Sequence, residues 1–423
     1  MSEPVAPSSA QAWRVLSLST SAFTLLFAAW LVFGIIAPPI RREFALDEVQ
    51  VSWLGALAVL VGSVLRLPLG MATDRLGGRR VFIALLVLAA IACGLLATAS
   101  SYGALLACAA LVGLAGNSFS AGIAWNAAWF DRARQGFALG TFGAGNVGAS
   151  VTKLAGPLLI ALIPVGGLAG GLIPGGWRAV PAMLCIALLL MALAVWRLAP
   201  ADRTPGKGRA LGAMLAPLAC LRVWRFGLYY VLVFGAYVAL SLVLPSFYVE
   251  TYSLSLAQAG MLTALFIFPA SLLRPLGGWM SDRWGARPVT YGVFALMLLA
   301  TLPLAAPALG LGAQPGVGAF TALMIALGVG MGVGKASVFK YIADYFPADV
   351  GAVGGLVGTL GALGGFALPL AFGYLKRGTG EPAMMFLVLA ALTVVTLAWL
   401  HVVVVGMRRA KPSGVALSPA LDG

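Results

Sequence analysis

Apolar stretches long enough to cross a lipid bilayer recur along the whole 423-residue chain. A bilayer core of about 30 Å needs about 20 apolar residues in a helix. Only 9% of the residues are charged, whereas a soluble domain carries roughly a quarter. The sequence therefore predicts an all-α membrane protein, embedded in the lipid bilayer, with twelve transmembrane helices. They lie at approximately 14–38, 50–71, 81–99, 103–129, 136–163, 178–198, 226–249, 257–280, 288–309, 317–345, 350–373 and 382–407.

The net charge of +14 indicates membrane topology and not a nucleic-acid partner. Most basic residues fall in the termini and in alternate loops that would share one side of the membrane. Examples are Arg75, Arg79, Arg80, Arg132, Arg134, Arg203, Lys207, Arg209, Arg408, Arg409 and Lys411. Cytoplasmic loops carry such an excess, which predicts cytoplasmic termini and a multi-pass protein of the cell inner (cytoplasmic) membrane. The four cysteines show no metal or redox spacing, and we expect neither a metal nor a cofactor.

One long polar connection divides the predicted helices six and six. It covers residues 199–222, which we expect to be a cytoplasmic linker. The linker separates an N-terminal six-helix bundle at 1–198 from a C-terminal bundle and short cytoplasmic tail at 223–423.

The two halves also resemble each other in sequence. A shift of 208 positions lays Ser63–Arg79 on Ser271–Arg287, with eight of 17 residues identical. A second repeat joins the glycine-dense Gly136–Gly148 to Gly351–Gly365. Duplicated six-helix halves are typical of transporters that hold their substrate between the halves, near the middle of the membrane.

Arg66 and Arg274 occupy matching positions of the repeat and are both expected within the membrane. Each lies eight residues before an aspartate, Asp74 or Asp282, a distance of about 12 Å along a helix. Intramembrane arginines normally face a cavity and have a function; snorkelling to the interface is the alternative. No carboxylate lies in the middle of a predicted helix. The planar guanidinium groups suit a small flat oxyanion, which we predict as the substrate.

The loop GMATDRLGGRR (Gly70–Arg80) resembles the signature between helices 2 and 3 of the major facilitator superfamily. Gly278–Arg287 is similar to the weaker copy of that signature after helix 8. The resemblance implies two pseudo-symmetric six-helix bundles. It also implies that the loop residues latch the halves in the outward-open state. These residues are Asp74, Arg75 and Arg79 with Asp282 and Arg283 in the copy.

FGAGNVGAS (Phe142–Ser150) and GGLVGTLGALGGF (Gly354–Phe366) resemble the two signature motifs of the NarK-type nitrate/nitrite porters. The resemblance covers nearly the whole chain. It implies that nitrate and nitrite are the substrates, clamped between Arg66 and Arg274 during alternating access. By the same resemblance, further substrate contacts come from Asn146, Phe119, Tyr230 and Phe339, with Tyr229, Phe234 and Tyr237 as competitors for the place of Tyr230.

The coupling mode stays open between symport and antiport. GKASVFKYIADYFPADVGAVGG (Gly334–Gly355) resembles the proton-coupled importer branch, which favours nitrate/proton symport over nitrate/nitrite exchange. Buried lysines can change their protonation state, so Lys153, Lys335 and Lys340 are candidates for proton coupling. Lys340 can equally pair with Asp344, four residues further on, and Lys153 can extend to an interface.

Two other functions remain open alongside nitrate transport. The site can serve another small anion, such as a monocarboxylate or a dicarboxylate, which substrate competition would distinguish. A non-transporting sensor or a membrane enzyme is the third possibility. The only histidine, His401, has no metal spacing or nucleophile around it, so an enzyme is not expected. We expect a monomer whose partners are nitrate, nitrite and protons.

Overall fold

The computed structural model describes residues 9–130, 132–164, 166–171, 173–202, 211–347 and 349–409. Within these ranges, eleven helices are long and apolar enough to cross a membrane, and one bent helix pair makes a twelfth. Each predicted span overlaps one of them, so the predicted all-α fold with twelve transmembrane helices is confirmed. The basic residues Arg203, Lys207, Arg209 and Lys411 lie outside the described residues.

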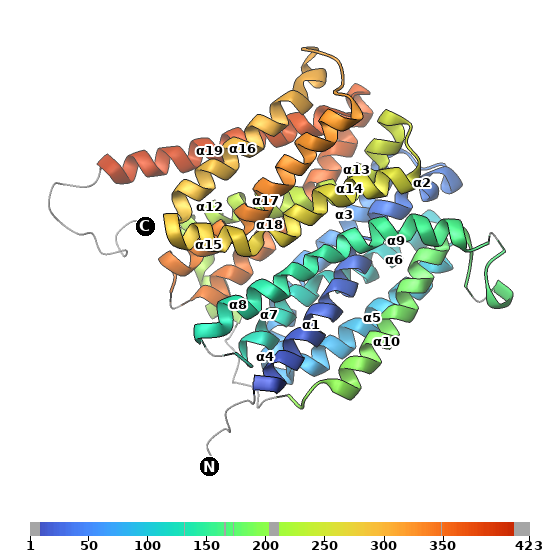
Figure 1. Ribbon diagram of the computed structural model, residues 1–423, viewed down its shortest axis with the longest axis horizontal. Helices are drawn as coiled ribbons and strands as arrows, with labels where there is room; N and C mark the ends of the chain where they lie inside the picture. The colour runs from blue at the N-terminus through green and yellow to red at the C-terminus, as the bar shows by residue number, and fades with distance from the viewer. Residues whose placement is uncertain are drawn as a thin grey trace.

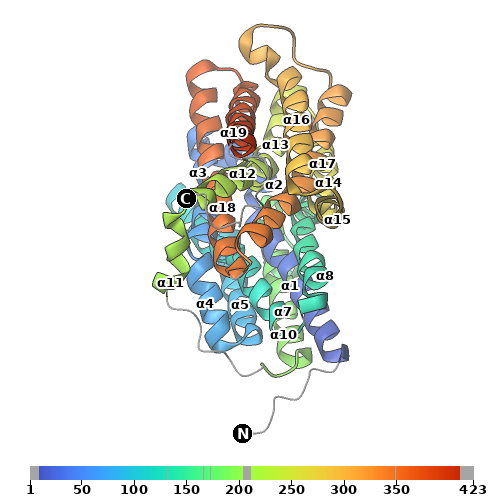
Figure 2. The ribbon, with the colours of Figure 1, turned by 90° about the vertical axis from the view of Figure 1, so that its left-hand side faces the viewer.

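Two bundles of helices lie side by side, and two perpendicular views agree on this (Figures 1 and 2). The first bundle, blue to green, contains α1 (Ser9–Trp30), α2 (Phe33–Phe44), α3 (Glu48–Val64), α4 (Arg66–Leu76), α5 (Gly78–Ala97), α6 (Tyr102–Gly113), α7 (Ser118–Ala127), α8 (Arg132–Gly143), α9 (Gly148–Leu162) and α10 (Ala179–Leu198). After α11 (Leu211–Leu215), the second bundle contains α12 (Leu221–Tyr230), α13 (Ala236–Tyr252), α14 (Leu256–Leu272), α15 (Arg274–Trp284), α16 (Ala286–Ala305), α17 (Val317–Tyr345), α18 (Val350–Thr379) and α19 (Met384–Arg409).

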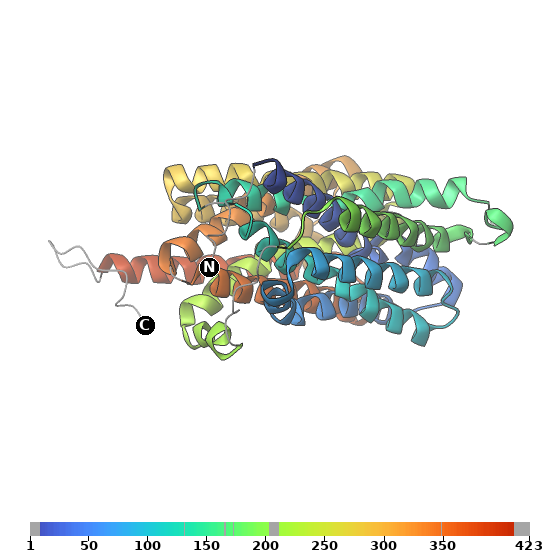
Figure 3. The ribbon, with the colours of Figure 1, turned by 90° about the horizontal axis from the view of Figure 1, so that it is seen from below.

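The helices run roughly along the length of the molecule (Figure 3). The yellow α15 and the end of the red α19 lie at one end, and the green connection between α9 and α10 lies at the other. We call the first the signature-loop end, because the turns at Gly77 and Gly285 are there, and the second the opposite end. The two turns have φ of 92° and 87°, which glycine adopts without the steric cost of a Cβ.

The sequence repeat is also a repeat of local structure at the starts of α3 and α14. Asp47 and Gln50 form a capping box at the start of α3. Ser255 and Gln258 form the same box at the start of α14. Each pair satisfies two backbone N–H groups that a helix start leaves without partners, so both helices begin at equivalent positions of the repeat.

Both helices then break at equivalent residues. Leu65 and Leu273 leave the helical region with φ/ψ of −84°/3° and −82°/4°. Pro68 and Pro275 follow within the next turn, and a proline cannot donate to the carbonyl four residues before it. The break bends α3 against α4 by 45°. As a result, Arg66 and Arg274 are the first residues of α4 and α15.

Candidate functional site

Buried positive charge without a negative partner marks the contact between the bundles. Among the described residues, the buried charged side chains are Arg66, Lys153 and Lys335. Every ion pair found in the described ranges involves other cations. Arg274 is half-buried. A charge removed from water is costly unless it is paired, so this interior favours an anionic ligand.

Arg66 reaches from the first bundle to the backbone of the second. Its Nε donates to the Gly62 carbonyl at 3.0 Å, beside the helix break. Its Nη1 donates to the Gly358 carbonyl in α18 at 3.2 Å. Its Nη2 is buried without a partner in the structure. Two hydrogen bonds therefore fix the guanidinium and leave one nitrogen for a ligand.

In the second bundle, a lysine makes the bond to the carbonyl beside the break. Ala270 is the residue that aligns with Gly62, and its carbonyl accepts a hydrogen bond from Lys335 Nζ at 2.9 Å. The same Nζ lies 3.3 Å from the ring centroid of Tyr237. Because Lys335 bonds this carbonyl, the guanidinium of Arg274 is available, and its buried Nη1 has no partner.

Aromatic rings bring the two arginines to one place. The Cζ atoms of Arg66 and Arg274 lie 5.8 and 5.5 Å from the centroid of the same Phe119 ring. Phe339 lies 5.2 Å from Arg274 Cζ and meets Tyr230 edge-on at 5.3 Å. The Tyr230 hydroxyl lies beside both guanidinium groups. The structure thus brings together five of the residues that sequence reasoning assigned to substrate binding.

Asn146, the sixth predicted contact, is buried with an unsatisfied side chain. It lies in the 3₁₀ turn Ala144–Val147 between α8 and α9. Neither its Oδ1 nor its Nδ2 has a partner, whereas its backbone carbonyl accepts from the Tyr237 hydroxyl at 3.2 Å. An unsatisfied buried amide costs about 1–3 kcal/mol, which a polar ligand would recover.

Each arginine faces a glycine of the other bundle. Gly358 of the second bundle accepts the hydrogen bond of Arg66. A Cβ added at Gly143 of the first bundle would lie 3.0 Å from Arg274 Nη1. On α18, a Cβ at Gly361 would overlap the Tyr230 ring. The two glycine-dense stretches therefore form walls of the site, in addition to packing helices together.

Two further aromatic rings lie beside Arg66. Its Cζ lies 5.6 Å from the Trp30 ring and 5.4 Å from the Phe234 ring. Phe234, one of the residues that competed for the place of Tyr230 in the sequence, stacks on Tyr230 at 5.1 Å. Trp30 is the contact that sequence reasoning missed. No motif marks Trp30, whose Nε1 donates to the Ala58 carbonyl at 2.9 Å.

The other two candidate coupling lysines lie apart from the arginines. Lys153 Nζ donates at 2.8 Å to the Leu31 carbonyl, in the break between α1 and α2. Lys340 pairs with Asp282 at 3.2 Å and with Asp344 at 3.1 Å. Of the three lysines, only Lys335 contacts the aromatic residues around the arginines.

The residues of the predicted latch do not join the bundles in this structure. Asp74, Arg75 and Arg283 are exposed, and none of the ion pairs in the described ranges includes them. The Arg79 guanidinium donates to the Trp196 carbonyl in its own bundle. Its backbone N–H donates to Asp202 at 2.8 Å, a cap on α5 that sequence reasoning did not find. Asp282 pairs with Lys340 inside the second bundle.

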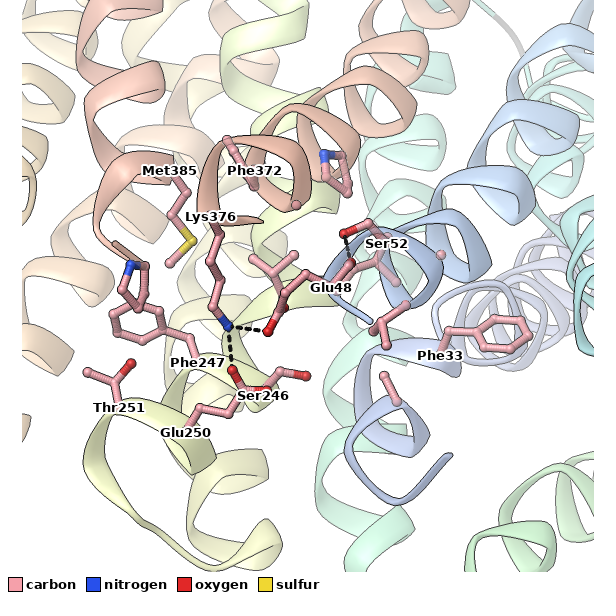
Figure 4. Close-up of a pocket in the computed structure, with 18 residues that line it drawn as sticks. Phe33, Glu48, Ser52, Ser246, Phe247, Glu250, Thr251, Phe372, Lys376 and Met385 are labelled. Carbon is pink, nitrogen blue, oxygen red and sulfur yellow. Dashed lines mark hydrogen bonds and ion pairs between the residues drawn. The ribbon is translucent and has the colours of Figure 1, made fainter. Parts of the chain in front are cut away.

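At the opposite end, four charged side chains form a ring across the two bundles. Arg41 and Glu48 belong to the first bundle, and Glu250 and Lys376 to the second. Arg41 contacts Glu48 at 2.6 Å and Glu250 at 2.5 Å. Lys376 contacts Glu48 at 2.9 Å and Glu250 at 2.5 Å. Figure 4 shows the Lys376 ammonium between the two carboxylates, at a pocket between the bundles.

Each cation of this ring has one carboxylate partner in its own bundle and one in the other bundle. If the bundles separated here, Arg41 would retain Glu48 and Lys376 would retain Glu250. The backbones also approach closely nearby, where a Cβ at Gly34 would lie 2.6 Å from the Ser241 carbonyl. The molecule is therefore closed at the opposite end by contacts that can separate without isolating a charge.

Comparisons with known proteins agree with this architecture. The family model of the Major Facilitator Superfamily matches residues 18–226 and again 226–421. A solved bacterial homologue of the human lysosomal transporter Spinster, in an inward-facing and unoccupied conformation, superposes with a TM-score of 0.74. That likeness covers 97% of this chain and 100% of the other at 17% sequence identity, so it concerns the fold alone.

Relatives at higher sequence identity show to which family within the superfamily the chain belongs. A probable nitrate/nitrite antiporter NarK1 of Thermus thermophilus is 56% identical over 404 residues, covering 92% of this chain and 91% of that protein. A probable nitrate/nitrite transporter NarK2 of Mycobacterium tuberculosis is 34% identical, covering 91% of this chain and 95% of that protein. The chain belongs to the major facilitator superfamily and, within it, to the nitrate/nitrite porter family, whose members are transporters and not enzymes.

Proposed function

We propose that this protein carries nitrate and nitrite across the inner membrane by holding the anion between Arg66 and Arg274. The observation that carries the proposal is buried positive charge with unpartnered nitrogens on Arg66, Arg274 and Asn146. Nitrate is a planar monoanion, and guanidinium groups donate parallel hydrogen bonds to planar oxyanions. The nitrate and nitrite named for the relatives support the same substrates here.

The two bundles, 1–198 and 223–423, would rock around this site in alternating access. The basic residues predict that the signature-loop end faces the cytoplasm, together with both termini. The opposite end is then periplasmic, and its closure by the ring of Arg41, Glu48, Glu250 and Lys376 corresponds to an inward-facing state. The unengaged signature-loop residues agree with that state, since the family's latch acts in the outward-open one.

Nitrate/nitrite exchange is the coupling mode that the geometry favours. Lys153 and Lys335 each donate to a backbone carbonyl, which supports a role for both as structural donors. The relative at 56% identity is named an antiporter. Proton symport stays the second candidate, because the Gly334–Gly355 stretch resembles the importer branch.

Nitrate uptake into proteoliposomes tests both proposals. Vesicles loaded with nitrite at equal pH should take up nitrate, whereas empty vesicles under an inward proton gradient should not. Arg66→Lys and Arg274→Lys should each raise the KM for nitrate about tenfold or more, because a point charge replaces a bidentate donor. Arg197→Lys, an exposed arginine of α10, is the matched control.

Three results would count against these proposals. Uptake into empty vesicles driven by protons would favour symport. Normal kinetics in both arginine variants would exclude the clamp. Equal competition by formate or a dicarboxylate would point to another small anion as the substrate.

A further inference from the structure

A second group of basic and hydroxyl side chains lies at the signature-loop end of the second bundle, outside the anion site. It surrounds a pocket whose lining residues come from α12, α16, α17 and α19. Figure 2 labels these four helices. Arg225, Tyr229, Arg287 and Tyr345 supply its polar wall. Nothing in the proposed transport cycle uses these residues.

The pocket carries positive charge that no carboxylate balances in the part of the chain that the structure describes. Arg225 lies with its Cζ 5.4 Å from the Phe226 ring. Arg287 Nη2 donates to the Tyr345 hydroxyl at 2.5 Å and approaches Met407 Sδ at 3.3 Å. Neither arginine takes part in an ion pair with a described residue. The starts of α12 and α16 lie at this end too, and helix N-termini carry partial positive charge.

A buried hydroxyl in the same pocket also lacks a partner. Tyr229 is 1% exposed, and its hydroxyl forms no hydrogen bond in the structure. Buried tyrosine hydroxyls usually find a partner, because an unsatisfied one costs about 1–3 kcal/mol. The pocket therefore offers a donor to an acceptor oxygen beside its two arginines.

The equivalent arginine of the first bundle makes a different contact. Arg79 aligns with Arg287 in the repeat, and its guanidinium donates to the Trp196 carbonyl of α10. Arg287 instead bonds a tyrosine hydroxyl and faces the pocket. The two aligned arginines therefore have different surroundings, and of the two it is Arg287 that lines this pocket.

The remaining wall of the pocket is apolar and belongs to α19. Val404 and Met407 line it, and the neighbouring Val402 is 67% exposed on a helix that we expect to face lipid. A free inorganic anion has no use for such a wall, whereas the acyl chain of a lipid does. Basic pockets between transmembrane helices at the cytoplasmic face bind anionic lipid head groups.

We infer that this pocket binds the phosphate of an anionic phospholipid. Arg225 and Arg287 would neutralise the phosphate, the Tyr229 hydroxyl would donate to one of its oxygens, and α19 would guide the acyl chains. The lipid belongs to the cytoplasmic leaflet in the proposed orientation. The inference otherwise stands apart from nitrate transport.

Native mass spectrometry of the delipidated full-length protein can test this site. Phosphatidylglycerol should bind roughly thirtyfold more strongly than phosphatidylcholine, since each of the two arginines near an anionic head group contributes about 1 kcal/mol and a factor of ten corresponds to about 1.4 kcal/mol. The double variant Arg225→Gln/Arg287→Gln should lose most of that preference. Tyr229→Phe, which deletes only the hydroxyl, should weaken phosphatidylglycerol binding severalfold. Arg197→Gln, at the same end but outside the pocket, should bind like the wild type.

Two outcomes would overturn the inference. One is an unchanged preference for phosphatidylglycerol in the double variant. The other is displacement of the lipid by millimolar inorganic phosphate, which would identify a site for free phosphate instead. Thermal unfolding of each variant controls for misfolding. Nitrate uptake in the same variants separates the two proposals, because lipid binding is measured without any transport.

Discussion

Replacement of Lys335 can distinguish two roles of this buried lysine. It either stabilises the helix break between α14 and α15 or carries a proton during transport. Its Nζ donates to the Ala270 carbonyl at 2.9 Å and lies 3.3 Å from the Tyr237 ring. Lys335→Met keeps the apolar stem and removes both interactions. The carbonyl left unpaired costs about 1–3 kcal/mol, and the lost cation–π contact adds up to about 2 kcal/mol. Relief from burying an ammonium offsets part of this.

The expected net loss is therefore about 1–3 kcal/mol, or a factor of about 5–150. Because the bond to Ala270 lies one helical turn before Arg274, the loss should appear as a higher KM for nitrate and a lower unfolding temperature. Lys335→Gln is the matched variant, since it retains a neutral N–H donor but has no proton to release. We expect it to keep nitrate exchange within about threefold of the wild type, because one hydrogen bond contributes about 1 kcal/mol.

The assay is the initial rate of nitrate uptake into proteoliposomes, with internal nitrite or with an inward proton gradient, together with thermal unfolding in detergent. A proton carrier would behave differently from a structural donor. The reasoning is refuted if the wild type shows proton-driven uptake that both variants abolish, or if both variants lose nitrate/nitrite exchange equally, while their unfolding temperatures stay unchanged.

Three further substitutions have definite expected results. Gly143→Ala places a Cβ 3.0 Å from a guanidinium nitrogen of Arg274. It should raise the KM for nitrate about fivefold (about 1 kcal/mol). The control Gly140→Ala, whose Cβ meets nothing within 4 Å, should leave the KM unchanged. Asn146→Leu removes an unsatisfied buried amide, so the unfolding temperature should rise while nitrate affinity falls about tenfold (about 1–3 kcal/mol); a fall in both would contradict this role. Lys376→Met removes one ion pair between the bundles, worth about 1 kcal/mol at most when partly exposed. It should increase alkylation of a Ser52→Cys reporter up to about fivefold, and an unchanged rate would argue against the ring as a gate.

The sequence by itself determined the membrane fold, because lipid imposes a local rule. Every backbone polar group must be satisfied inside the bilayer, so each apolar stretch of about 20 residues has to be a helix. The repeat predicted a candidate site as well. Arg66 and Arg274 were identifiable because a buried charge is costly, and because its recurrence at matching positions of two halves favours a common use.

Only the tertiary structure decided which groups satisfy these charges. Trp30 contacts Arg66, although no sequence motif marks Trp30. Arg41 pairs with Glu250, which is 209 residues away in the sequence. A buried lysine can serve chemically as a proton carrier or as a hydrogen-bond donor. In this structure Lys335 donates to the carbonyl of Ala270, which is 65 residues away in the chain. Sequence spacing predicts which residues share a helix face, whereas contacts between helices depend on how the two bundles pack.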